Sequence, residues 1–71
     1  MRRSEVMAKI GRRAREVGLP VRVTEGAKHS RVRIGETSIT TVPRGSHEIA
    51  SGTARAIFKD LEPDLGEGWW R

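Results

Sequence analysis

The sequence predicts an α+β fold in which one helix is followed by three antiparallel strands and a second helix. Apolar residues recur at helical spacing between residues 4 and 17, and again between residues 51 and 61. Between these two segments, residues 21–42 alternate polar and apolar side chains and are interrupted by glycine-containing turns. Two helices can cover one face of such a sheet and leave its other face in water.

The first predicted helix runs from about Ser4 to Val17. Ser4 is expected to be its N-cap, and Glu5 lies favourably at the positive end of the helix dipole. Gly18, followed by Leu19-Pro20, is typical of a helix stop. The apolar stripe of this helix consists of Val6, Ile10, Ala14 and Val17.

Short alternating segments predict the first and third strands. Residues 21–25 place two valines on one face. Gly35-Glu36 is interpreted as a two-residue hairpin turn, after which residues 37–42 pair back as the third strand. Ile39 and Val42 differ in parity, so we expect a bulge or a late twist there, and the pattern leaves the inward face of this strand open.

The second strand is expected over residues 29–34, after a turn at residues 26–28. Val32 and Ile34 share one face of this strand, and the intervening polar residues share the other. This alternation predicts an imidazole and two guanidinium groups in a row on the solvent side of the sheet, from His29, Arg31 and Arg33.

The last predicted helix begins with Ser51 as its N-cap and is closed by Pro63. We expect a single domain over residues 1–71, with residues 4–62 as its main part and residues 63–71 as a C-terminal tail. The small predicted core consists of Val6, Ile10, Val17, Val21, Val23, Val32, Ile34, Ala54, Ile57, Phe58 and Leu61.

Two tryptophans in the tail, Trp69 and Trp70, allow two interpretations. They either fold back to enlarge a thin core, or they form a stacking platform for bases or an anchor for a partner. Acidic residues around the tail would repel phosphate, which favours the core or a partner.

Charge is distributed unevenly along the chain, whose formal net charge is +5. Residues 1–35 contain ten basic and three acidic residues, a balance of +7, whereas residues 36–71 contain four basic and six acidic residues, a balance of −2. A basic half of this kind suits a polyanion, because each phosphate that Lys or Arg neutralises releases counterions.

Several classes of protein are disfavoured by the composition. The chain has no cysteine, which excludes disulfides and thiolate-bound zinc and fits a reducing compartment. No apolar stretch approaches the roughly 20 residues that span a bilayer, and the N-terminal segment does not resemble a signal peptide. We therefore expect a cytoplasmic protein that does not act at a membrane.

The order α-β-β-β-α is that of the double-stranded RNA-binding domain, and three segments of the chain resemble one family with this fold. These are the bacterial HicA toxins of toxin–antitoxin pairs. The similar segments are residues 26–32 (GAKHSRV), 41–44 (TVPR) and 52–59 (GTARAIFK), in an order and spacing that are fairly specific together. The resemblance covers roughly residues 4–62.

The resemblance implies a metal-independent endoribonuclease that cleaves mRNA, blocks translation and is neutralised by a HicB-like antitoxin protein. In this family a glycine-led turn delivers one histidine onto the second strand, and that histidine matches His29. The chemistry of the residues agrees with this assignment. RNA supplies its own 2′-hydroxyl nucleophile, so cleavage needs proton transfer, for which histidine is suited by its ordinary pKa of about 6.5, and cations for the phosphorane.

The remaining candidate residues are basic groups for RNA and a second proton carrier. The second carrier is His47, a water molecule or no protein group. The two histidines, eighteen positions apart and without cysteine, do not make a closed zinc site, so we expect neither a metal nor another cofactor. The expected RNA contacts are Lys28, Arg31, Arg33, Arg44, His47 and Arg55.

Two other functions compete with a ribonuclease. One is a non-catalytic RNA-binding module of the same fold that reads the shape of A-form RNA. The other is an adaptor whose basic face docks an acidic protein.

Overall fold

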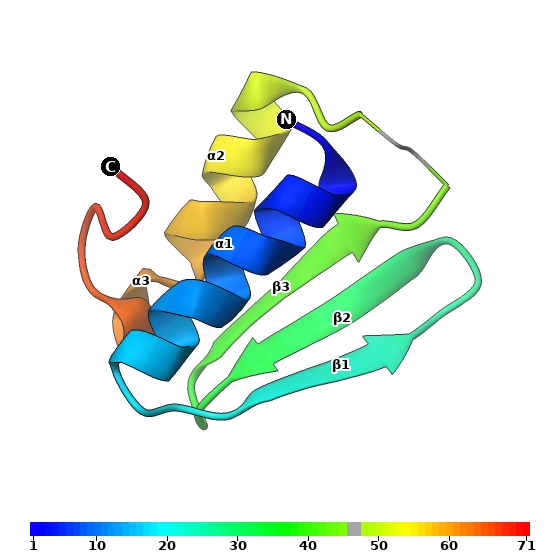
Figure 1. Ribbon diagram of the computed structural model, residues 1–71. Helices are drawn as coiled ribbons and strands as arrows, with labels where there is room; N and C mark the ends of the chain where they lie inside the picture. The colour runs from blue at the N-terminus through cyan, green and yellow to red at the C-terminus, as the bar shows by residue number, and fades with distance from the viewer. Residues whose placement is uncertain (46–47) are drawn as a thin grey trace.

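The computed structural model describes residues 1–45 and 48–71 and confirms the α+β order (Figure 1). A three-stranded antiparallel sheet has the order β1-β2-β3, so β2 is central and the other two strands form its edges. The helices cover one face of this sheet and leave the other face open (Figure 1). The elements are α1 (Arg3–Glu16), β1 (Val21–Glu25), β2 (His29–Ile34), β3 (Ser38–Pro43), α2 (Ser51–Asp60) and α3 (Glu62–Leu65).

The N-cap of helix α1 lies two residues earlier than the sequence pattern predicts. Arg2, not Ser4, is the N-cap, and the Glu5 carboxylate accepts the Arg2 backbone N–H at 2.8 Å. The expected helix stop is confirmed, because Gly18 adopts a φ of 72° that glycine tolerates best. The N–H groups of Gly18 and Leu19 then satisfy two carbonyls of the last helical turn.

The hydrophobic core lies between the helices and the sheet. It consists of Val6, Ile10, Ala14, Val32, Ile34, Val42, Ile49, Ala54, Ile57, Phe58, Leu61 and Leu65. The prediction was wrong for Val17, Val21 and Val23, which are 38%, 37% and 44% exposed. All five residues of β1 are exposed, because this edge strand extends beyond the cover of the helices.

Strand β3 starts at Ser38 after a three-residue loop, so the expected two-residue turn and the start at Thr37 were wrong. The register with β2 continues from Ser38 to Pro43 without a bulge. The inward residues are Ser38, Thr40 and Val42. Two of them are polar and find partners in the helix layer: the Ser38 hydroxyl donates to Leu61 O at 3.3 Å, and the Thr40 hydroxyl donates to Asp60 at 2.8 Å.

The C-terminal tail is part of the fold. Pro63 does not end the structured region; it stands in the first turn of α3, where the missing N–H costs nothing. The Trp69 indole N–H donates to Phe58 O at 2.8 Å, and both tryptophan rings pack on Phe58 with centroid distances of 5.1 and 6.1 Å. This confirms the interpretation of the tryptophans as an extension of the core.

Helix α2 begins at Ser51, as expected, but its N-cap is Ala50. The Ala54 N–H donates to Ala50 O at 2.9 Å, and no side chain in the described part of the chain caps this end of the helix. Ser51 is therefore the first helical residue, and its predicted capping function was wrong.

Candidate nucleic-acid interface

The open face of the sheet carries the predicted row of polar residues on β2. Burial alternates strictly along this strand: His29, Arg31 and Arg33 are exposed, while the residues between them are buried against the helices. Because strand residues two apart lie about 6.7 Å from each other on one face, the three side chains form a line across the middle of the sheet. The sequence pattern predicted this line correctly.

The register adds one cation to this face that sequence reasoning missed. Arg22 of β1 pairs with Arg33, and Thr24 of β1 pairs with Arg31, so Arg22 belongs to the same open face. Thr41 of β3 flanks Arg31 from the other side. The signal for Arg22 was present, since it stands between two valines in an alternating strand, but only the pairing shows which β2 residue it joins.

His29 lies in a shallow hollow on the sheet. The hollow is lined by Thr24, Glu25, Gly26, His29, Arg31 and Thr41. On the open face itself, the imidazole is thus accompanied by a guanidinium group and two hydroxyl groups. These groups can exchange a proton, neutralise a phosphate and donate hydrogen bonds to its oxygens, which is the chemistry that a phosphodiester requires.

The turn before His29 needs glycine at its first position. The Gly26 N–H donates to His29 O at 2.9 Å, and a Cβ on Gly26 would lie only 2.9 Å from that same oxygen. No other residue fits without moving the start of β2. The glycine-led turn therefore sets where the His29 backbone begins the strand.

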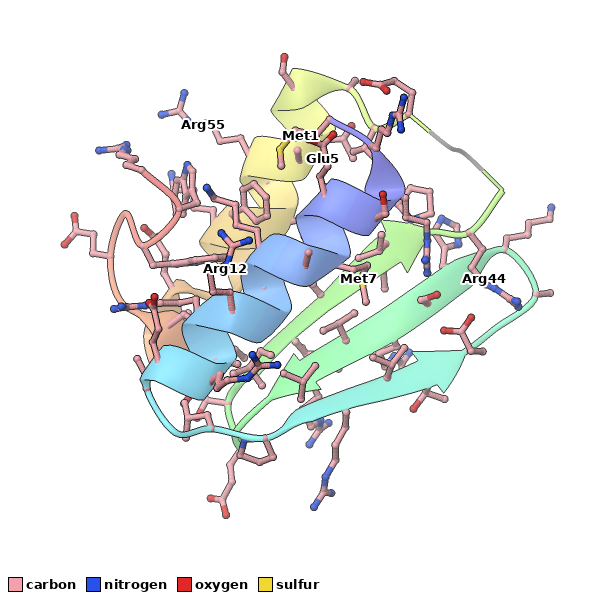
Figure 2. The ribbon with its side chains drawn as sticks, viewed as in Figure 1. Met1, Glu5, Met7, Arg12, Arg44 and Arg55 are labelled. Atoms are coloured by element: carbon pink, nitrogen blue, oxygen red, sulfur yellow. The ribbon has the colours of Figure 1, made fainter. Side chains whose placement is uncertain are left out.

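Arg44 holds this turn from the end of β3. Its Nε pairs with Glu25 at 2.9 Å, its guanidinium group also donates to Gly26 O, and its backbone N–H donates to Lys28 O at 3.0 Å. The Arg44 side chain therefore binds other residues of the protein, at the tip of the sheet beside the β1–β2 turn (Figure 2). A sequence pattern cannot show this partner, because Glu25 and Arg44 are nineteen positions apart.

A second set of contacts continues from Glu25 beneath the strand. The Ser30 hydroxyl, which is fully buried, donates to Glu25 at 2.9 Å and accepts from Arg3 at 2.7 Å. Arg3 also donates to Pro43 O at 3.1 Å. The start of α1 is thereby connected to the ends of all three strands on the covered side, directly below His29.

The other predicted RNA contacts do not share one surface. Lys28 is exposed in the turn that precedes His29. Arg55 lies on α2 in the helix layer, on the side of the molecule opposite the open face (Figure 2). His47 lies outside the described residues. The structure thus brings together His29, Arg31 and Arg33 with Lys28 beside them, and separates Arg55 from this group.

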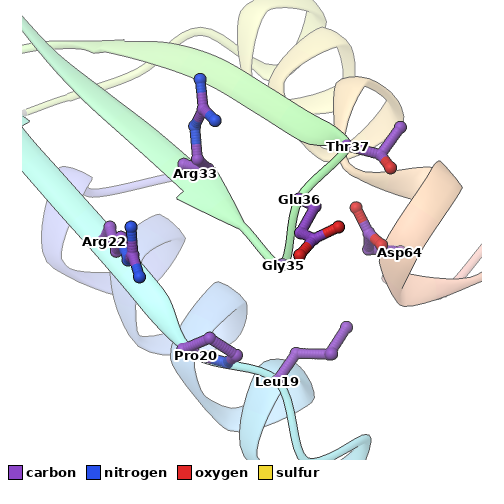
Figure 3. A pocket seen from close by; sticks show the side chains of 8 residues that line it. All are labelled: Leu19, Pro20, Arg22, Arg33, Gly35, Glu36, Thr37 and Asp64. Carbon is purple, nitrogen blue, oxygen red and sulfur yellow. The ribbon is translucent and has the colours of Figure 1, made fainter.

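The far end of the sheet has its own polar arrangement (Figure 3). Arg22 and Arg33 line a hollow there with Asp64, which comes from α3 and lies against the β2–β3 loop. The Asp64 carboxylate accepts the Ser38 N–H at 2.7 Å. Hydrogen bonds from the Ser38 side chain and backbone lower the pKa of Asp64 below its ordinary value. Asp64 is therefore a structural carboxylate that fixes the hairpin.

Comparison with protein-family models, with curated proteins and with solved structures finds no match. Within residues 1–45 and 48–71, no group of three or more His, Cys, Asp or Glu side chains is placed to hold a metal ion. The described helices are too short and too polar to cross a membrane. The case for a function thus rests on the open face and on the sequence motifs.

Proposed function

We propose that this protein is an endoribonuclease of the HicA toxin type, which cleaves mRNA in the cytoplasm and so blocks translation. The observation that carries the proposal is the position of His29: an exposed imidazole beside Arg31, on the uncovered face of a sheet, after a turn that only glycine fits. The HicA-like motifs around residues 26–32, 41–44 and 52–59 support the same assignment.

The proposed reaction uses the nucleophile that RNA itself supplies. His29 accepts the proton of the 2′-hydroxyl, whose oxygen attacks the adjacent phosphorus. The bond from phosphorus to the 5′-oxygen then breaks, the 5′-oxygen takes a proton from water, and a 2′,3′-cyclic phosphate is left. Arg31 stabilises the charge of the phosphorane, and Arg33 and Arg22 hold the phosphates that follow along the strand.

Water is assigned as the proton donor because Glu25, the carboxylate in the hollow around His29, is engaged by Arg44 and Ser30. The positions of β1, β2 and β3 that face the open side hold basic, hydroxyl and apolar side chains and no carboxylate. When the protein supplies only one proton carrier, the reaction lacks the rate enhancement that a second one would add. That enhancement is about 10²–10⁴-fold for each positioned group. We therefore expect a slow enzyme.

A HicB-like antitoxin is the proposed partner. Its carboxylates or bulky side chains would cover the open face around His29 and exclude RNA. Because it binds only the folded toxin, it would also raise the stability of the toxin by mass action.

The experiment that tests the proposal compares wild type with His29→Ala on a labelled single-stranded RNA in the presence of a chelator. We expect His29→Ala to lower the cleavage rate by about 10²–10⁴-fold while RNA affinity changes little. Lys59→Ala, an exposed change on α2, serves as the control and should cut RNA at the wild-type rate. Equal cleavage by His29→Ala would show that the catalytic assignment is wrong.

Two further outcomes separate the alternatives. Tight RNA binding without cleavage by wild type would identify a non-catalytic RNA-binding module. A loss of rate in His47→Ala as large as that in His29→Ala would replace water with His47 as the second proton carrier. In cells, induction of wild type but not of His29→Ala should arrest growth and fragment mRNA, and co-expression of a HicB-like protein should restore growth.

A further inference from the structure

A second basic surface lies on the helix layer, on the opposite side of the molecule from His29. It is a polar hollow between α1 and the C-terminal tail, lined by Lys9, Arg12, Arg13, Glu16, Trp69 and Arg71. Figure 2 shows Arg12 on the outer side of α1, away from the sheet. Four of the six lining residues are cations and one is an acid.

Glu16, the one acidic side chain that lines the hollow, does not neutralise its positive charge. Glu16 pairs with Arg13 at 3.3 Å, which leaves three positive charges without a carboxylate partner in this hollow. The side chains of Lys9 and Arg12 form no hydrogen bond or ion pair with any residue in the described part of the chain. Like charges three and four positions apart on a helix repel each other by a few tenths of a kcal/mol, so this cluster is not explained by helix stability.

The tail fixes the shape of the hollow. The Arg13 Nε donates to Leu65 O at 3.0 Å, so this guanidinium group is held in place. Trp69 is anchored by its bond to Phe58 O, and the Arg71 guanidinium group lies 5.6 Å from the centre of the Trp70 ring. Part of the wall of the hollow is therefore fixed before any ligand binds, whereas Lys9 and Arg12 are free to adjust to one.

We propose that this hollow is a binding site for single-stranded RNA, separate from the open face of the sheet. The cations are repeated along one side of α1, which suits a ligand with repeated negative charges, and the Trp69 ring at the wall supplies a stacking surface for a base. An acidic peptide also matches the charge, and the titrations below distinguish it from RNA. The site does not depend on His29, so the experiments that test it are independent of the proposed nuclease activity.

Together with the proposed function, on which this consequence rests, the site gives a protein that contacts RNA on two opposite sides. The open face holds the phosphodiester that is cut, and the helix layer holds another segment of the same or a neighbouring strand. Loss of the helix-layer site should raise the KM for a long RNA and leave its kcat unchanged, because the site is remote from the reacting atoms.

Tryptophan fluorescence tests the proposal, because both tryptophans of the chain are in the tail and neither is on the sheet. A ten-residue oligouridylate is titrated into full-length His29→Ala, in which we expect cleavage to be slow enough for a binding measurement. We expect a saturable change in fluorescence. Lys9→Gln/Arg12→Gln should weaken the binding seen by fluorescence on the order of tenfold at 0.1 M salt, and reduce the slope of log K against log salt by about 1.4.

The matched control is Arg31→Gln/Arg33→Gln, which removes the same charge from the opposite face. It should leave the midpoint of the fluorescence titration nearly unchanged, and circular dichroism verifies that both variants are folded. An equal loss in both variants would show general charge attraction and overturn the proposal. Binding of labelled oligouridylate with no change in tryptophan fluorescence would do the same.

Two more outcomes assign the ligand and separate this site from the nuclease. A fluorescence change with oligoglutamate but none with oligouridylate would identify a protein-binding surface and contradict the RNA assignment. If wild type cuts no RNA but the fluorescence titration behaves as expected, the nuclease proposal fails and the helix-layer site stands. Cleavage that depends on His29 without any fluorescence response gives the reverse result.

Discussion

The two faces of the sheet use alternate residues of the same strands for different purposes. On the covered face of β2, Ser30, Val32 and Ile34 are fully buried. On the open face, Arg31 and Arg33 are exposed, and their side chains make no hydrogen bond or ion pair with the described residues. Successive residues of a strand point to opposite faces of the sheet. Residues that stabilise the fold therefore alternate along β2 with residues that carry the charge of the candidate site.

This difference teaches where substitutions should affect folding and where they should affect binding. A buried side chain contributes by leaving water and by satisfying buried polar groups. An exposed guanidinium group in high dielectric contributes little to stability, so it is available for a ligand. The predictions below compare equivalent changes on the two faces.

The largest effect is expected for a core residue of β2. Ile34→Ala removes a fully buried side chain and should lower the free energy of unfolding by about 2–5 kcal/mol. Ile39→Ala, on the open face and 39% exposed, should cost less than about 1 kcal/mol. Urea denaturation measures both. Equal losses of unfolding free energy would show that the covered face does not contribute more to stability than the open face.

A smaller loss is expected for the buried hydroxyl beneath His29. Ser30→Ala removes the group that connects Arg3 and Glu25, and leaves those polar groups partly unsatisfied. We expect a loss of about 1–3 kcal/mol, because unsatisfied buried polar groups are costly. Thr41→Ala removes a hydroxyl from the open face and should change stability by less than about 0.5 kcal/mol. A similar result for both variants would contradict a supporting function for Ser30.

The Asp64 contact should give a pH-dependent contribution. Its lowered pKa means that the ionised form is favoured in the folded protein, so the contribution is present above the ordinary value near 3.8 and is lost as the pH falls through the lowered value. Asp64→Asn should therefore have a lower Tm than wild type at pH 7. The difference should narrow in melts below pH ~3.8. A constant difference across this range would mean that the charge of Asp64 is not involved.

The smallest effects are expected for the exposed arginines. Arg44→Gln breaks the pair with Glu25, and should lower stability by up to about 1 kcal/mol because the pair is partly exposed. Arg33→Gln should stay within about 0.5 kcal/mol of wild type and weaken RNA binding. Thermal melts and RNA titrations of the two variants provide the measurement. A larger loss of RNA affinity in Arg44→Gln than in Arg33→Gln would return Arg44 to the group of direct RNA contacts.

The order of the elements and the His29 row could be predicted because both depend on local periodicity. The helical spacing of residues 6, 10 and 14 and the alternation of residues 29–34 each specify which side of an element is apolar. The same reasoning failed for Val21 and Val23. Alternation shows that two residues share a face, but not whether a helix reaches far enough to cover it.

The sequence pattern could not predict polar contacts between residues that are far apart in the sequence. Arg44 looked like an RNA contact because its charge is visible in the sequence and its partner Glu25 is not. Ser38 and Thr40 point inward although they are polar, because Leu61 and Asp60 of the helix layer accept their hydrogen bonds. The inward face of β3 therefore depended on contacts that form only when the chain is folded.

The sequence by itself determined the order of the two main helices and the three strands, the glycine-led turn before His29, and the placement of that histidine in one row with Arg31 and Arg33. These features follow from backbone sterics and from the periods of helix and strand, which act over a few residues. The tertiary structure alone decided that Arg22 joins the row, that Arg44 is engaged within the protein, and that the tail forms a second basic hollow against α1. Those features depend on which surfaces meet when apolar side chains are buried together, and that outcome depends on the whole chain.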